Sequence, residues 1–143
     1  MKELIIVKEI LKYNKYSCVI SDGNEMVYTS VERGVKPLLE YYHHQFSQSC
    51  DHSLYVADKV IGKGAAFILV LLSIKGLYTP VISQSALELL QKYGIEVQCD
   101  RIAPFIKNRT GEGRCPIESA VIDEEDPVMA LDKIIMKVKE LTK

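Results

Sequence analysis

Residues 76–98 of the chain read GLYTPVISQSALELLQKYGIEVQ, and this stretch decides the fold class. Gly76 to Ile82 is a short run rich in β-branched and aromatic residues, which is typical of a strand. Ser83 then suits the N-cap of a helix that ends at Gly94, and Ile95 to Gln98 forms the next strand. Strand, helix and strand with short connections predict two parallel strands joined by a right-handed crossover. We therefore expect an α/β protein.

The segments on either side of this stretch extend the alternation of helices and strands. Apolar residues at helical spacing predict helices over Glu3–Asn14, Gly34–His44, Ala57–Ser73 and Asp126–Leu141. The pair Asp22-Gly23 favours the positive φ angles of a tight turn between two antiparallel strands, Ser17–Ile20 and Met26–Tyr28. The helix from Ala57 is apolar on nearly every face, so we expect it to be buried against a sheet and against other elements.

The composition places the chain among globular proteins. Its 143 residues are the usual size of one domain, so we expect a single domain over residues 1–143. A content of 48% hydrophobic and 26% charged residues indicates neither a disordered nor a fibrous chain. The net charge of −1 and the isoelectric point near 6.3 offer no general attraction to nucleic acid or to an anionic membrane. We therefore expect neither of these partners.

The sequence also predicts where the protein is located. The longest apolar run, Gly64–Leu72, is too short to span a bilayer, which takes about 20 residues. The N-terminus lacks the cationic start, apolar stretch and cleavage site of a signal peptide, so we predict a cytoplasmic protein. Cys18, Cys50, Cys99 and Cys115 include no CxxC pair, and in a reducing compartment we expect all four to remain thiols.

Three short motifs carry a resemblance to a known family. They are Ala57-Asp58-Lys59-Val60-Ile61-Gly62-Lys63, Val81-Ile82-Ser83 before a helix, and Asn108-Arg109 followed by Cys115-Pro116-Ile117-Glu118. With them, almost the whole chain resembles domain-of-unknown-function family 1893, which is similar in fold to the cytidine deaminases. The resemblance implies a three-layer cytidine-deaminase-like sheet, with an N-terminal antiparallel hairpin, parallel strands and helices on both faces. It also implies that the helices from Ala57 and Ser83 pack side by side, with their N-termini at a shared cleft.

The two helix starts lack the residues of a zinc deaminase. Such an enzyme begins the first helix with His-x-Glu or Cys-x-Glu and the second with Pro-Cys-x-x-Cys, because three N/S ligands hold the zinc and the glutamate moves protons. Here the corresponding stretches are Val56-Ala57-Asp58-Lys59 and Ser83-Gln84-Ser85-Ala86. We therefore predict no metal site, no cofactor and no zinc-dependent deaminase reaction. Cys50-Asp51-His52, near His43 and His44, lacks a second ligand pair at recognised spacing and is better interpreted as a solvated loop.

Asp58, Lys59 and Lys63 are the first candidate ligand-binding residues. We expect them at the start of the Ala57 helix, with both lysines on one face through their i, i+4 spacing. One interpretation is an aspartate cap with two lysines that extend to solvent. The other is an anion-binding cleft in which the lysines join the free amides of the helix start. Gly62 and Gly64 indicate a close backbone approach, for which tight helix packing is favoured over ligand contact.

The stretch from Asn108 to Glu118 supplies the remaining candidates. Asn108 and Arg109 are expected in a loop that binds an anion. Cys115 lies where an N-cap is expected, with Pro116 in the first helical turn, and a helix N-terminus beside an arginine favours the nucleophilic thiolate. The alternatives are a buried cysteine that serves as a small hydrophobe, and a Glu118 that only caps a helix.

Three hypotheses for the function follow. The preferred one is a zinc-less, deaminase-like binding or regulatory domain for a small anionic ligand, nucleotide-like ligands included, held by Asp58, Lys59, Lys63, Asn108 and Arg109. The second is a metal-independent enzyme in which Cys115 attacks an electrophile while Glu118 or Asp58 handles protons. The third is a homo-oligomeric assembly module with an exposed surface around Tyr41 and Tyr42.

Overall fold

The computed structural model describes residues 2–46, 53–108 and 110–142. Its elements follow in the order α1 (Lys2–Tyr13), β1 (Cys18–Ser21), β2 (Met26–Ser30), α2 (Lys36–Phe46), β3 (Tyr55–Asp58), β4 (Val60–Ile61), α3 (Lys63–Leu71), β5 (Gly76–Ser83), α4 (Gln84–Lys92), β6 (Glu96–Ala103), α5 (Pro116–Ala120) and α6 (Pro127–Leu141). The six strands form one open sheet. β1 pairs antiparallel with β2 and β3, whereas β3, β4 and β6 all run parallel to β5. The sheet is therefore mixed.

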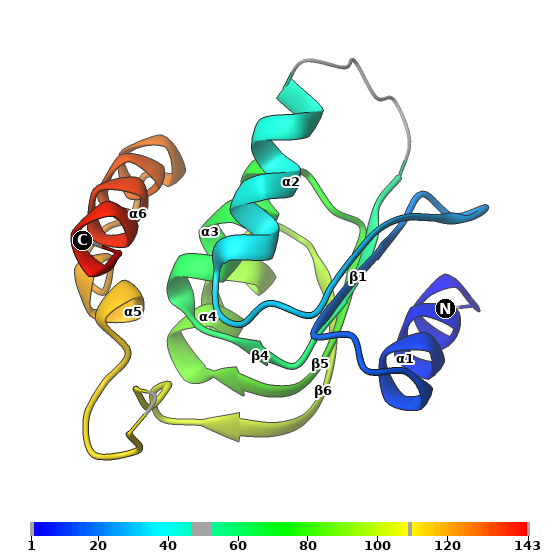
Figure 1. Ribbon diagram of the computed structural model, residues 1–143, viewed down its shortest axis with the longest axis horizontal. Coiled ribbons are helices and arrows are strands. Elements are labelled where there is room, and N and C mark those ends of the chain that lie inside the picture. The colour runs from blue at the N-terminus through cyan, green and yellow to red at the C-terminus, as the bar shows by residue number, and fades with distance from the viewer. Residues whose placement is uncertain (1, 47–52, 109, 143) are drawn as a thin grey trace.

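Helices cover both faces of this sheet (Figure 1). On one face, α1 packs Leu4, Val7 and Leu11 against residues of β1, β3 and β5. On the other face lie α2, α3 and α4, with α5 and α6 packed against the outer side of α3. Because α3 is enclosed in this way, its residues from Gly64 to Leu69 are all buried, as the sequence predicted. Each buried large apolar side chain of this kind stabilises the fold by about 1.5–3 kcal/mol.

The N-terminal hairpin and the parallel pairing of β5 and β6 are confirmed. Gly23 has φ +95°, and the Asp22 carboxylate accepts the amides of Asn24 and Glu25 at 2.9 and 3.0 Å, which fixes the turn. Ser83 is the N-cap of α4 as expected, since its hydroxyl accepts the amide of Ala86 at 3.2 Å. Among the described residues, no helix is long and apolar enough to cross a membrane.

The prediction of one helix from Ala57 to Ser73 is wrong in its first third. Residues Tyr55–Asp58 and Val60–Ile61 are strands β3 and β4, and the helix begins only at Lys63, after the N-cap residue Gly62. The error has a physical reason, because a short apolar run fits a buried strand as well as a buried helix. Pairing with β1 and β5, which the local sequence does not reveal, selects the strand.

Other differences concern the lengths and exposure of elements. β6 continues to Ala103, five residues beyond the predicted strand, and the helix start expected at Cys115 and Pro116 opens only a short helix, α5. Tyr41 is buried and packs against the Tyr28 ring with 5.5 Å between ring centroids, so it does not form the exposed surface that was expected around it. Tyr42 is half-buried.

Candidate functional site

The Glu118 carboxylate joins the N-termini of α3 and α4. Its Oε2 atom accepts the Lys63 amide of α3 at 2.6 Å and the Ser83 hydroxyl, the N-cap of α4, at 2.5 Å. Its Oε1 atom accepts the Ile106 amide at 2.8 Å. The side chain is buried, with 3% of its surface exposed. A carboxylate at this place offsets the unpaired amides and the dipoles of two helix starts at once.

Two glycines allow α5 to bring Glu118 this close to α3. A Cβ atom on Gly64 would lie 2.6 Å from Cγ2 of Ile117, and one on Gly62 would lie 3.0 Å from Oε2 of Glu118. A larger residue at either position would force α5 away. The interpretation of these glycines as a site of tight packing is therefore confirmed, and α5 is the element that packs there.

The chain around Cys115 holds the same region together. Cys115 is the N-cap of α5 and Pro116 is in its first turn, as the sequence predicted. The Cys115 amide donates to the Ile106 carbonyl at 2.8 Å, so Ile106 is bound through both its backbone groups. The Cys115 thiol itself makes no capping hydrogen bond and is half-buried. Its assignment as a nucleophile stays a prediction, as does a catalytic role for Glu118, whose described contacts all stabilise structure.

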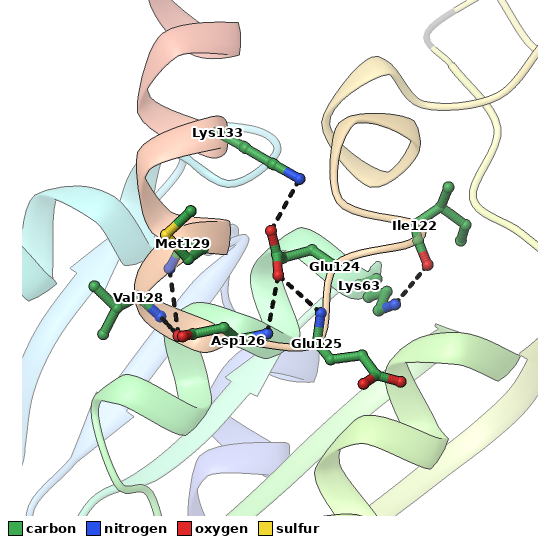
Figure 2. Close-up of polar contacts among 8 residues, drawn as sticks. All are labelled: Lys63, Ile122, Glu124, Glu125, Asp126, Val128, Met129 and Lys133. Carbon is green, nitrogen blue, oxygen red and sulfur yellow. Dashed lines mark hydrogen bonds and ion pairs between the residues drawn. The ribbon is translucent and has the colours of Figure 1, made fainter.

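The Lys63 side chain contacts the linker between α5 and α6. Its ammonium donates to the Ile122 carbonyl at 2.6 Å and lies 5.6 Å from the centroid of the Phe67 ring. Figure 2 shows this contact beside the ion pair of Lys133 with Glu124, which has an N–O distance of 2.9 Å. The ammonium therefore caps a carbonyl of this linker. Its proposed role in binding an anion stays a prediction.

Asp58 lies at the end of β3. The interpretation of this residue as a helix cap is therefore wrong. Its carboxyl accepts the Val60 amide at 3.3 Å, and it stands opposite Cys18 in the β1–β3 register. Only 6% of its surface is exposed, and this burial raises the pKa of Asp58 to about 7. Hydrogen bonds from the Val60 amide, the Cys18 thiol and the Lys59 amide lower the pKa by a smaller amount. Burial, and then the neighbouring Asp58 carboxyl, raise the pKa of Cys18 well above its usual value. Asp58 is thus a buried acid close to its titration midpoint at neutral pH.

The remaining predicted ligand residues lie in loops. Lys59 is exposed between β3 and β4, outside any helix, so its expected i, i+4 pairing with Lys63 is wrong. The side-chain Oδ1 atom of Asn108 accepts the Thr110 hydroxyl at 2.8 Å and the amides of Glu112 and Gly113 at 3.2 and 3.3 Å. Asn108 therefore closes its own loop. Arg109 and the segment Cys50-Asp51-His52 lie outside the described residues.

A groove of about 480 Å³ lies at the carboxyl ends of β4, β5 and β6. Most of its lining is apolar, and the residues are Val60, Val81, Arg101, Ile102, Ala103, Pro104, Phe105, Ile106 and Lys107. The guanidinium of Arg114 lies 4.3 Å from the centroid of the Phe105 ring. The backbone of Arg114 forms an isolated antiparallel β-bridge with that of Lys107. This edge is where open α/β sheets most often bind ligands.

Ile106 belongs both to the lining of this groove and to the hydrogen-bond partners of Glu118, which are Lys63, Ser83 and Ile106. Ile106 lines the groove, and its amide is held by Glu118. Val60, at the groove, follows directly on Asp58 and Lys59 of the first motif. The motif that contains Lys63 and the motif that contains Glu118 are therefore in direct contact, through the Lys63 amide and the Glu118 carboxylate.

Arg101 and Lys107, the two cations of the groove, were not among the candidate residues that the sequence indicated. The available signal was their position near the carboxyl end of a parallel strand, Arg101 within β6 and Lys107 after it, but the predicted strand stopped at Gln98 and left both in an unassigned loop. A smaller hollow of about 320 Å³ lies at the amino ends of β5 and β6, lined by residues that include Ser73, Lys75 and Tyr93. It contains none of the motif residues.

Comparisons with known proteins agree with one another. The family model described as "TM1506: Domain of unknown function (DUF1893)" matches residues 6–137. The crystal structure of a DUF1893 family protein, TM1506, from Thermotoga maritima is similar to the chain, with 26% sequence identity and a TM-score of 0.84. The match covers 95% of this chain and 90% of that one. No curated protein matches the chain.

Proposed function

The chain belongs to the DUF1893 family, and from its own geometry we propose that it is a domain that binds a small anionic ligand with an apolar body. The ligand lies in the groove at the carboxyl ends of β4, β5 and β6. Nucleotides belong to this class of ligand, since a base is flat and largely apolar while the phosphate is anionic.

The charge of the groove is the observation that carries the proposal. Arg101 and Lys107 line it and are both exposed, and none of the described residues of its lining is acidic. Between them the apolar surface of Val60, Ile102 and Phe105 can cover a ring. A pocket with an apolar floor and a few convergent polar groups is the usual form of a small-molecule site. An anionic group would lie against the two cations, as guanidinium and ammonium groups bind phosphate and carboxylate.

A cytidine-deaminase-like arrangement without zinc is part of the proposal. Its support is that α3 and α4 pack side by side and that their N-termini meet at one carboxylate, Glu118. A zinc deaminase uses this place for its metal and its N/S ligands. Here the Lys63 amide of α3 and the Ser83 hydroxyl that caps α4 donate to Glu118, and neither helix start carries His or Cys. The ligand site is therefore placed at the neighbouring groove and not between the helix N-termini.

Binding of an anilinonaphthalenesulfonate dye tests the proposal. The dye combines fused apolar rings with one sulfonate, and its fluorescence rises when its rings leave water. Reversal of both groove cations in Arg101→Glu/Lys107→Glu should weaken binding at least about tenfold, which corresponds to about 1.4 kcal/mol. The control variant Arg33→Glu/Lys139→Glu changes the net charge equally at two other sites and should bind as the wild type does.

The apolar floor needs its own variant. Ile102→Asp places a carboxylate on the floor of the groove and should also weaken binding of the dye, while urea unfolding shows whether the fold is retained. Equal binding by the wild type and by the doubly reversed variant would contradict the proposal, because the dye would then be held elsewhere.

A further inference from the structure

Asp58 is a buried carboxyl at the junction of β3 and β4. The junction is the single residue Lys59, which separates the two strands. The Asp58 carboxyl accepts the Val60 amide at 3.3 Å, while the Lys59 amide donates to the Ser17 carbonyl at 3.1 Å. These bonds define the bend that brings Val60 to the groove. The position of Val60 therefore depends on the state of the Asp58 side chain.

None of the described basic residues forms an ion pair with Asp58. From β1 it faces the Cys18 thiol, and beyond Cys18 lies Tyr28 of β2, whose hydroxyl donates to Glu40 of α2 at 3.0 Å. From β5, the nearby Thr79 hydroxyl is neutral and donates to the Val81 carbonyl.

The helix α3 offers no counter-ion either. Lys63 is the only titratable residue of α3, and its ammonium is held by the Ile122 carbonyl. A carboxyl without a cation in such a place is stable when protonated, because the hydrogen bonds that the Val60 amide, the Cys18 thiol and the Lys59 amide offer to the ionised form do not offset its loss of solvation.

We propose that ionisation of Asp58 loosens the junction of β3 and β4 and thereby makes the groove sensitive to pH. This inference rests on the proposed function for its consequence, since the groove is the ligand site assigned above. When Asp58 is protonated, the junction is closed and Val60 holds its place in the groove wall. When Asp58 is ionised, the junction opens to admit water, and the wall at Val60 loses its fixed position. The buried group titrates near neutrality, where a cell can use the change.

Hydrogen exchange of the Val60 and Ile61 amides tests the junction without any ligand. The variant Asp58→Asn keeps the side-chain shape and the acceptor for the Val60 amide but cannot ionise. Because opening is linked to the loss of one proton, each pH unit between about 4 and 7 should raise the opening constant of the wild type about tenfold, and the rise should level off above the raised pKa of Asp58. We expect the ratio of the wild-type to the variant exchange rate to grow about tenfold between pH 5 and pH 6 and to stay nearly constant above pH 8. The ¹³C shift of the Asp58 carboxyl should titrate near pH 7.

The dye tests the consequence for the groove. Wild-type affinity should fall severalfold between pH 6 and pH 8, while Asp58→Asn should keep the same affinity throughout. Equal exchange of wild type and variant at every pH, or a carboxyl midpoint below pH 5, would overturn the inference. The inference would also be overturned if Asp58 titrates and the junction opens while the affinity for the dye stays unchanged. If the dye binds neither protein at any pH, the proposed function fails, and the exchange data still decide whether the junction opens.

Discussion

Removal of the Glu118 side chain should be among the most destabilising single changes in this protein. Its carboxylate accepts three donors, the amides of Lys63 and Ile106 and the hydroxyl of Ser83, at 2.5–2.8 Å. A hydrogen bond to a charged group contributes about 1.5–3 kcal/mol, so a plain sum gives about 4.5–9 kcal/mol. The three bonds share one side chain, and water can reach part of the cavity that is left. We therefore expect Glu118→Ala to lower the free energy of unfolding by about 4 kcal/mol.

Urea unfolding monitored by circular dichroism measures this loss. With a slope of about 2 kcal/mol per molar urea, the midpoint should fall by about 2 M. Glu118→Gln should cost about half as much, because its oxygen can replace one carboxylate oxygen while its NH₂ group faces a donor. Glu125→Ala removes an exposed glutamate from the linker before α6 and should change the free energy of unfolding by less than about 0.5 kcal/mol.

Formate provides a second, independent readout. The cavity in Glu118→Ala retains three donors that converge on the space of one carboxylate, so formate should bind there and raise the unfolding midpoint. Chloride at the same ionic strength is the control, and the wild type should not respond to formate. A loss below about 1 kcal/mol for Glu118→Ala, or an equal response of wild type and variant to formate, would refute the view that this carboxylate joins the two helix starts.

The remaining predictions concern other parts of the fold. Because burial raises the pKa of Asp58 from 3.8 to about 7, the folded state binds a proton that the unfolded state has lost, and stability should fall by about 4 kcal/mol as pH rises from 4 to above 7. Urea unfolding across this range should show that loss in the wild type relative to Asp58→Asn, and a flat difference between the two would contradict it. Native alkylation read by mass spectrometry should label Cys115 before Cys99, which lies in a strand, and before Cys18, which is buried and has a raised pKa; Cys115 as the slowest thiol would remove the nucleophile hypothesis. Gly64→Ala should lower stability by about 1–3 kcal/mol in thermal unfolding, since the added methyl meets α5 at 2.6 Å, and a more stable variant would show that α5 yields freely.

Local signals in the sequence were sufficient for most elements of the fold. The Asp-Gly turn, the Ser83 cap and the apolar spacing of α1 and α6 each act within a few residues, so the sequence reveals them directly. β3 and β4 were missed because their apolar residues suit a strand and a helix equally. The choice between the two is made by pairing with distant segments, of β3 with β1, some forty residues earlier in the chain, and of β4 with β5.

The candidate site was harder to predict for the same reason. Gly62 and Gly64 indicated that another element approaches α3 closely. No local feature could show that this element carries Glu118, which is 55 residues away from its partner Lys63. The groove likewise draws Val60, Val81 and the segment after β6 from separate parts of the chain. The sequence therefore indicates which segments are important, but it does not show which of their residues contact one another.

The proposed ligand site is tested most directly by NMR chemical-shift mapping with adenosine 5′-monophosphate on the isotope-labelled protein. With the nucleotide, the largest shift changes should occur at the amides of Val60, Ile102 and Ile106 around the groove. Inorganic phosphate alone should change mainly the shifts of Arg101 and Lys107. Shift changes confined to other surfaces, or none at millimolar nucleotide, would contradict the assignment of this groove as a site for nucleotide-like anions.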